Sequence, residues 1–234
     1  MGLGVTRNDL VSALGWLVEA GVDTLVGDAA RTWLEPVAAV PVRADPPAML
    51  RVQAQPAMPA ASLAIGVDSL PALIAAITNY RSGALVDDGV AASGVMLVGD
   101  APTGDDIAAG RLFAGANGQL LDNMLASIGR DRGSAYLTNI SYWPDGAPAA
   151  AFLERQLQLA RPRAILALGG VATAALCGAG AGINRMRGRW QVARIGGDEI
   201  PVLPTFHPAY LLRQPQHKAL AWADLCAFRA LADA

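Results

Sequence analysis

The sequence predicts an α/β protein with three layers (α/β/α), in which helices cover both faces of a central, mostly parallel sheet. Two observations predict this fold. From residue 94 onward, short apolar runs alternate with longer segments whose apolar residues recur at helical spacing. Such alternation favours parallel strands joined by right-handed crossovers. The length of 234 residues allows one substantial core, and 53% hydrophobic with 16% charged residues excludes a disordered chain.

The N-terminal part has a different pattern. We expect residues 1–65 to form a helix and a Pro/Ala-rich arm, and residues 66–234 to form the folded domain. Residues 8–21 show helical spacing, and residues 35–63 hold six of the fifteen prolines. No apolar run reaches the roughly 18–20 residues that span a bilayer, and the first residues lack a signal-peptide pattern. We therefore expect a soluble, cytoplasmic protein without a membrane partner. We also expect a monomer, although no pattern in the sequence determines the oligomeric state.

The elements of the domain are predicted in order from their patterns. A helix begins after Ser69, which is a typical N-cap residue. The expected helices span 69–81, 118–129, 150–160 and about 216–232, and the expected strands span 94–99, 135–140 and 163–170, followed by apolar pieces at 189–195 and 200–206. The strand at 94–99 (GVMLVG) is apolar throughout, as expected for a buried parallel strand.

Ligands of such sheets bind at the carboxyl ends of the strands. This rule indicates the loop from Gly99, the turn after Asn139 and the loop around His207. Acids in the first loop could act on a developing positive charge or merely cap a turn. An asparagine closing a strand could read a base edge or shape a turn. A histidine before proline could donate to an oxyanion or be purely structural.

Charge is distributed unevenly along the chain. The net charge is −2, but residues 1–150 carry 8 basic and 15 acidic side chains, whereas residues 151–234 carry 10 basic and 5 acidic ones. A basic half can hold phosphate even when the whole protein is acidic. The alternative interpretation is a solvated surface with no nucleic-acid partner.

The two cysteines, Cys177 and Cys226, lie in apolar surroundings that are typical of buried free thiols. They cannot supply the four thiolates of an iron–sulfur cluster. With only two histidines, His207 and His217, a zinc site is not expected either. The sequence therefore predicts no metal and no cofactor.

Several segments together resemble one family. GDAP at 99–102, Phe113-Ala114-Gly115, YLTN at 136–139 and HPAYLLR at 207–213 occur in the order and rough spacing of bacterial uracil-DNA glycosylases. They most resemble the iron–sulfur, family-four enzymes. The resemblance runs from about residue 70 to the end, and it implies an enzyme that excises uracil from single- or double-stranded DNA.

The resemblance also implies roles for individual residues. Gly99, Asp100, Ala101 and Pro102 would form the water-activating loop, and Asp106 would be a second catalytic carboxylate. Phe113 would stack on the flipped uracil, Asn139 would bond its Watson–Crick edge, and His207 would stabilise charge on the uracil oxygen. The implied DNA contacts of the C-terminal part are Tyr210, Leu211 and Arg213, to which we add Arg187 and Arg189 as phosphate contacts. Arg187 could instead pair with an internal carboxylate.

This sequence departs from the family pattern in two ways. The segments at 80–85 and 138–157, where the family's cluster cysteines would lie, contain none, so we expect apolar packing there by Leu85, Trp143 and Phe152. Asp100 replaces the usual glutamate, and Asp is one methylene shorter. Two functions therefore stay open: a metal-independent uracil-DNA glycosylase, or a catalytically weak DNA-binding protein that assists repair. A small-molecule α/β enzyme is a third, remote alternative, because no nucleotide-binding fingerprint is present.

Overall fold

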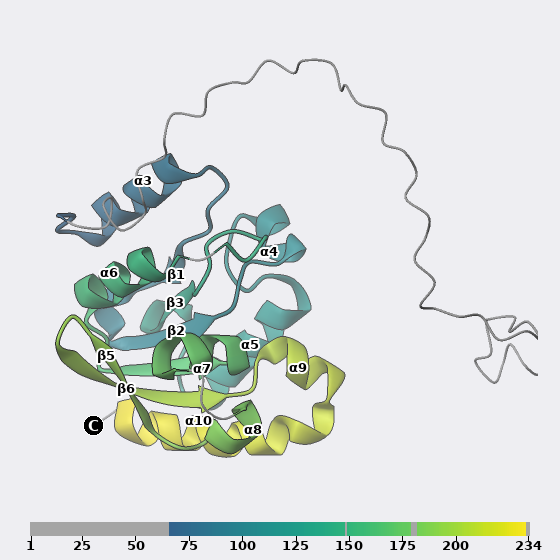
Figure 1. The fold of residues 1–234 in the computed structure, drawn as a ribbon. Helices are drawn as coiled ribbons and strands as arrows, with labels where there is room; N and C mark the ends of the chain where they lie inside the picture. The colour runs from purple at the N-terminus through teal and green to yellow at the C-terminus, as the bar shows by residue number, and fades with distance from the viewer. Residues whose placement is uncertain (1–65, 148, 179–181, 233–234) are drawn as a thin grey trace, which may run out of the picture. The chain divides into compact units, whose positions relative to one another are not determined.

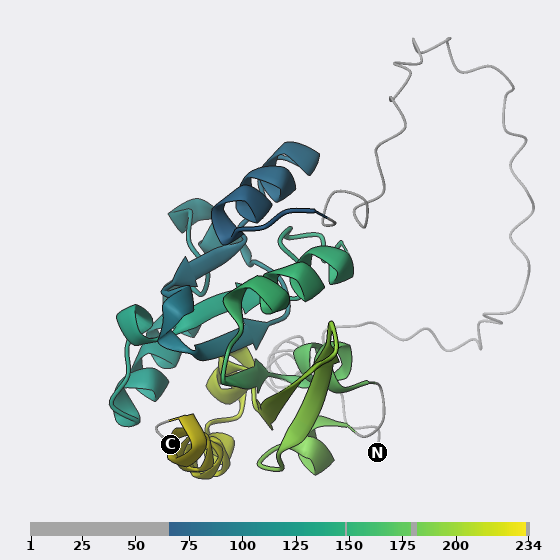
Figure 2. The same cartoon turned by 90° about the vertical axis from the view of Figure 1, so that its left-hand side faces the viewer.

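The computed structural model describes residues 66–147, 149–178 and 182–232, which form a six-stranded sheet with helices on both faces (Figures 1 and 2). The strand order is β1-β3-β2-β4-β6-β5. The four inner strands, β3 (Tyr136–Asn139), β2 (Val95–Gly99), β4 (Ala164–Leu168) and β6 (Asp198–Thr205), pair in parallel. The edge strands β1 (Asp87–Gly89) and β5 (Gln191–Ile195) are antiparallel to their neighbours. The predicted α/β/α fold with a mostly parallel sheet is confirmed.

Alternate residues of the strands face opposite helical layers, as the two-residue period of a strand requires. Leu97 and Leu166 face one core, which contains α5 (Gly115–Ser127), α9 (Pro208–Arg213) and α10 (Lys218–Ala232). Met96 and Ile165 face the other core, which contains α6 (Ala150–Ala160) and α7 (Gly170–Cys177). Helices therefore cover both faces of the sheet, and strands β2 and β4 are apolar at every position.

A third apolar cluster joins α3 (Leu70–Tyr80) to α6 and to the segment after β3. Its buried members are Leu73, Ile77, Val86, Tyr142, Trp143, Ala149 and Phe152. The packing predicted for this region is confirmed for Trp143 and Phe152. Leu85 packs instead against the core that contains α5 and α10. Helix α3 and helix α10 consequently lie on opposite sides of the described part of the chain (Figure 1).

Four short elements were not predicted, and one of them is helix α7, which has eight residues. Strand β1 has only three residues and no apolar alternation. Helix α4 (Gly104–Ala109) is six residues long and starts at a capping box between Thr103 and Asp106. Helix α8 (Ile183–Met186) is a single turn. Helix α5 also begins three residues earlier than expected, because Gly115 adopts a left-handed φ of +60° that turns the chain into the helix.

The helix and arm expected within residues 1–65 lie outside the described residues. Among the residues that are described, every helix is too short or too polar to cross a membrane.

Candidate active site

The ends of β2 and β3 are joined by backbone hydrogen bonds that continue past the strands. Gly99 is paired with Asn139 in the parallel ladder. The next two amides of β3, Ile140 N and Ser141 N, donate to the carbonyls of Gly99 and Asp100, each at 3.0 Å. This fixes the start of the Gly99–Pro102 loop and leaves the Asp100 side chain exposed at the edge of the sheet.

Gly99 makes room for two of the predicted site residues. A side chain at this position would collide with Asn139 Oδ1 and would approach Phe113 Cζ within 2.6 Å. Asn139 is only 2% exposed, and its Oδ1 atom has no hydrogen-bond partner among the residues that the structure describes. Buried polar atoms are nearly always bonded in native proteins, so an unpartnered amide oxygen here indicates a ligand position. The Asn139 amide and the Phe113 ring therefore lie side by side next to Gly99.

Phe113 is buried and has an unusual backbone. Its φ of +51° lies in the left-handed region, which is rare for a residue with a bulky side chain. The ring centroids of Phe113 and His207 are 6.2 Å apart, with an angle of 37° between the planes. Asn139 ends β3 and His207 follows β6, whereas Phe113 comes from the loop between α4 and α5. The three predicted positions are thus brought together.

His207 is held as the N-cap of α9. Its Nδ1 atom accepts a hydrogen bond from Ala209 N at 3.1 Å. Burial lowers the pKa of His207 below the ordinary 6.5, the charge of Arg213 acts in the same direction, and the carboxylates of Asp100 and Asp106 oppose it. The ring is therefore neutral at pH 7. Because Nδ1 is an acceptor, the single ring proton must be on Nε2, which becomes a donor.

A pocket of about 290 Å³ adjoins these residues. It is lined by Asp100, Ala101, Thr103, Leu168, Gly169, Gly170, Val171, His207, Ala209, Tyr210 and Arg213. The wall from Gly169 to Val171, at the end of β4, was missed as part of the site. The glycines that close the predicted strand at 163–170 were the available signal, because loops at carboxyl strand ends bind ligands.

Asp106 was predicted to be a second catalytic carboxylate. It is buried, and both of its oxygens accept backbone hydrogen bonds: Oδ2 from Thr103 N at 2.7 Å and Oδ1 from Ala114 N at 2.5 Å. The side chain therefore ties the Gly99–Pro102 loop to the Phe113 loop. Its oxygens face backbone amides of the protein.

Helix α9 exposes a different leucine from the one predicted to contact DNA. Leu211 is 1% exposed and belongs to the core beneath α5 and α10. The prediction for Leu211 is wrong, because its side chain is needed for packing. Leu212 is 41% exposed and Arg213 is also exposed. Tyr210 lines the pocket, and its hydroxyl is hydrogen-bonded to His217 Nδ1 at 2.7 Å.

Arg187 was predicted to contact phosphate, and the structure favours the alternative. Its Nε donates to Asp224 Oδ2 at 3.0 Å, its Nη2 also bonds Asp224, and its guanidinium lies 5.4 Å from the Phe206 ring centroid. Asp224 Oδ2 further accepts from Thr205 Oγ1 at 2.8 Å. Arg187 is thus an internal ion-pair partner that anchors the end of β6 just before His207. Arg189, in contrast, is exposed.

The residues present do not fit the iron–sulfur cluster of the family-four enzymes. Cys177 lies on α7 and Cys226 on α10, which pack on opposite faces of the sheet. Where the cluster would be expected, the Tyr80 ring packs on Trp143 and Phe152, with centroids 6.1 and 5.5 Å away. An ion pair between Arg81 and Asp145 (2.6 Å) closes the same region. Within residues 66–147, 149–178 and 182–232, no group of three or more His, Cys, Asp and Glu side chains is placed to hold a metal ion.

Fold and site together define an α/β/α protein with a pocket at the carboxyl edge of its sheet, where Asp100, His207 and Arg213 stand among apolar residues. Residues 86–226 match the family model described as "Uracil DNA glycosylase superfamily". This match spans more than half of the chain, and the chain belongs to that superfamily.

Similar proteins carry names from the same family. The chain is 34% identical over 164 residues to a type-4 uracil-DNA glycosylase of Pyrobaculum aerophilum, covering 64% of this chain and 84% of the relative. Type-4 enzymes of Sulfurisphaera tokodaii (30% over 169 residues, 66% of this chain and 77% of the relative) and Archaeoglobus fulgidus (33% over 153 residues, 59% and 75%) are similar as well.

Proposed function

We propose that this protein hydrolyses the N-glycosidic bond of uracil in DNA. The observation that carries the proposal is the buried Oδ1 of Asn139, which lacks a partner among the described residues and lies beside the Phe113 ring, with the His207 ring next to Phe113. A uracil flipped out of the DNA would stack on Phe113, and its N3–H would donate to that oxygen. The names of the similar proteins support the same substrate.

The two ends of the breaking bond need opposite charges. As the bond from uracil N1 to the sugar C1′ breaks, the electron pair leaves with uracil, and the sugar gains oxocarbenium character. In our proposal Nε2–H of His207 donates to the developing negative charge on the uracil oxygen. Asp100, exposed beside it, faces the sugar and accepts a proton from the attacking water. Each such oriented group contributes about 10²–10³ in rate.

The neutral state of His207 suits this task. A neutral imidazole donates to an oxyanion, needs no counter-charge in the free protein and releases no proton when uracil leaves. Uracil can therefore depart as the anion and take its proton from water later. The hydrogen bond from Ala209 N to Nδ1 fixes both the tautomer and the orientation of the ring.

Asp106 has a positioning role in our proposal. Its two oxygens hold the amides of Thr103 and Ala114. It therefore acts on catalysis through the Asp100 loop and the Phe113 loop, without touching the sugar. Gly99, Ala101 and Pro102 supply the backbone of the first loop, in which Pro102 is buried.

DNA would be bound along the rim of the pocket. We propose that Arg189 and Arg213 contact phosphates, because both are exposed and phosphate contacts dominate affinity for DNA. Leu212, projecting from α9, would fill the space that the flipped base leaves, and Tyr210 would support it from the pocket wall. We propose that the protein acts as a monomer in the cytoplasm, on single- or double-stranded DNA, without metal or cluster.

One feature favours a second candidate, a DNA-binding protein that assists repair but excises uracil weakly. Asp100 is one methylene shorter than the glutamate that the family resemblance implies at this position. A displacement on the order of 1 Å of a reacting group can cost about 100-fold in rate. The two candidates predict different outcomes when the carboxylate is lengthened.

The test is excision of uracil from single-stranded and duplex oligonucleotides by the purified full-length protein, with cytosine and thymine oligonucleotides as controls. The glycosylase proposal expects release of free uracil and alkali-labile abasic sites on uracil substrates alone. Tight DNA binding without release, by both the wild type and Asp100→Glu, would favour the accessory function.

A further inference from the structure

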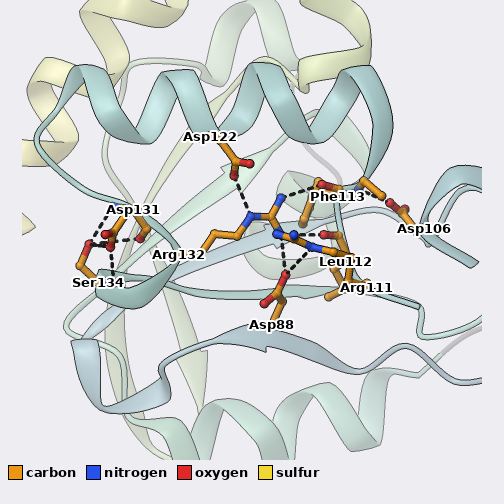
Figure 3. Close-up of polar contacts among 10 residues, drawn as sticks. Asp88, Asp106, Arg111, Leu112, Phe113, Asp122, Asp131, Arg132 and Ser134 are labelled. Atoms are coloured by element: carbon orange, nitrogen blue, oxygen red, sulfur yellow. Dashed lines mark hydrogen bonds and ion pairs between the residues drawn. The ribbon is translucent and has the colours of Figure 1, made fainter. Parts of the chain in front are cut away.

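Arg132 lies close to the backbone of Phe113, and its guanidinium makes four hydrogen bonds. It belongs to the short 3-10 turn η2 (Arg132–Ser134) between α5 and β3, and its side chain is only 15% exposed. Nε donates to Asp122 Oδ1 at 2.7 Å, and Nη1 forms an ion pair with Asp88 Oδ2 (Figure 3). The two carboxylates thus fix the plane and direction of the guanidinium.

The remaining N–H groups of Arg132 reach across to the chain around Phe113. Nη1 donates to the carbonyl oxygen of Leu112 at 2.8 Å, and Nη2 donates to that of Phe113 at 2.6 Å (Figure 3). One guanidinium therefore holds two successive carbonyls in place. A left-handed residue with a side chain persists only when its surroundings enforce that conformation, and Phe113 is such a residue.

The peptide that follows Phe113 is fixed from its other side. The amide of Ala114 donates to Asp106 Oδ1, so the carbonyl and the N–H of this one peptide have separate partners. Gly118 on α5 completes the arrangement, because any side chain there would collide with the Phe113 carbonyl. Asp106 lies on the side of the Asp100 loop, whereas Arg132 connects the peptide to β1 and α5.

We propose that Arg132 is a positioning residue for uracil excision: it holds Phe113 in the left-handed conformation that presents its ring to the flipped base. The inference rests on the proposed function, because it assigns the ring to base stacking. It assigns Arg132 no contact with DNA. Its effect on catalysis therefore has to pass through Phe113.

Arg132→Met keeps an unbranched apolar stem but lacks the guanidinium, so it removes all four hydrogen-bond contacts. We expect the single-turnover rate of uracil release to fall about 10- to 100-fold, since displacement of a positioning group by about 1 Å has such an effect. Affinity for undamaged duplex DNA should change less than twofold. Arg132→Lys should restore little, because one ammonium cannot reproduce a planar fork that contacts two carbonyls and two carboxylates.

Arg130→Met is the matched control. Arg130 precedes the same turn, and its Nη1 and Nη2 atoms donate to the carbonyls of Ser134 and Ala232 rather than to the Phe113 loop. We expect its excision rate to stay within twofold of the wild type. Equal losses of rate in Arg130→Met and Arg132→Met would overturn the proposal, since they would indicate a general loss of structure.

A double-mutant cycle separates positioning from general stabilisation. In a Phe113→Ala background the ring is absent, so adding Arg132→Met should lower excision by less than twofold further. If the two substitutions multiply, Arg132 acts through something other than Phe113, and the proposal is wrong. Should Arg132→Met fail to fold, Asp122→Asn removes the negative charge of one anchor of the guanidinium at an exposed site. An unchanged excision rate in that variant would count against the proposal.

A spectroscopic readout does not depend on activity. The four phenylalanines of the chain can be replaced by 4-fluorophenylalanine, and the Phe113 signal can be assigned from its loss in Phe113→Leu. In Arg132→Met, or in Asp122→Asn, we expect the ¹⁹F resonance of Phe113 to shift or broaden, while those of Phe152, Phe206 and Phe228 stay in place. An unmoved Phe113 resonance would overturn the inference. If the wild type releases no uracil, the proposed function fails, and this measurement still decides whether Arg132 holds Phe113.

Discussion

Replacing Arg187 with methionine should reveal a structural residue within the basic C-terminal part. The substitution leaves Asp224, whose side chain is 2% exposed, with Thr205 as its remaining side-chain partner. Breaking a buried ion pair by removing one partner costs about 3–5 kcal/mol. For a domain of this size, 1 kcal/mol shifts Tm by about 2–4 °C, so we expect a loss of about 6–20 °C.

The assay compares two arginines that are close in sequence. Urea unfolding of Arg187→Met should show the lost stability, whereas the exposed Arg189→Met should stay within about 0.5 kcal/mol of the wild type. In salt titrations of duplex binding we expect the opposite: Arg189→Met is the variant that changes, and Arg187→Met is not. Arg189→Met should lower the slope of log K against log salt by about 0.9, the value for one phosphate contact, and folded Arg187→Met should leave it unchanged.

A third variant checks the physical reason. In Arg187→Met with Asp224→Leu, the unpaired buried charge is gone, so a large part of the lost stability should return. The reasoning is refuted if Arg187→Met is as stable as Arg189→Met and lowers the salt dependence of binding. Arg187 would then reach the DNA, as the charge pattern alone had suggested.

Three further predictions concern the site and the proposal that the protein holds no iron–sulfur cluster. Because burial lowers the pKa of folded His207, its contribution to stability is complete above pH 6.5 and is lost as the pH falls from 6.5 toward the folded-state pKa. Excision should fall at lower pH, as the folded protein itself titrates through that lowered pKa. His207→Ala should remove this component of the melting profile and cut excision about 100-fold, and a loss below threefold would contradict the placement of the site. Asp100→Glu should raise excision, by up to about 100-fold, and Asp100→Asn should lower it; no gain with glutamate would show that carboxylate length is not limiting. The purified protein should be colourless, and chelators should leave its melting curve unchanged; stoichiometric iron would contradict this. Apolar packing by Trp143 should stabilise this region instead, so Trp143→Ala should cost about 3–5 kcal/mol in the free energy of unfolding.

The main strands could be predicted because they are short and buried, and because β2 and β4 are continuous apolar runs covered on both faces. The runs at 94–99 and 163–170 correspond to β2 and β4, and the segment at 135–140 to β3. Strand β1 could not be predicted, because it pairs through only three residues and packs no apolar face of its own. Its place at the sheet edge depends on a distant partner, β3.

The site was predictable where function lies at strand ends and less so where it depends on side-chain direction. Asn139, Phe113 and His207 converge as expected. Two adjacent leucines on α9 differ only in helical phase, so the sequence could not tell that Leu211 is buried and Leu212 exposed. The contacts of Arg132 cross 19 and 20 residues to two backbone carbonyls, and no spacing rule predicts such pairs.

The most direct test of the central claim is a single variant, Asn139→Leu, measured for both uracil release and thermal stability. Leucine has nearly the same shape and removes the buried oxygen that has no partner in the described structure. Because an unsatisfied buried polar atom costs about 1–3 kcal/mol, the variant should be as stable as the wild type or more stable. We predict that it loses uracil release by about 100-fold or more while binding DNA normally. Release within threefold of the wild type, or a large loss of stability, would contradict the assignment of Asn139 to the uracil site.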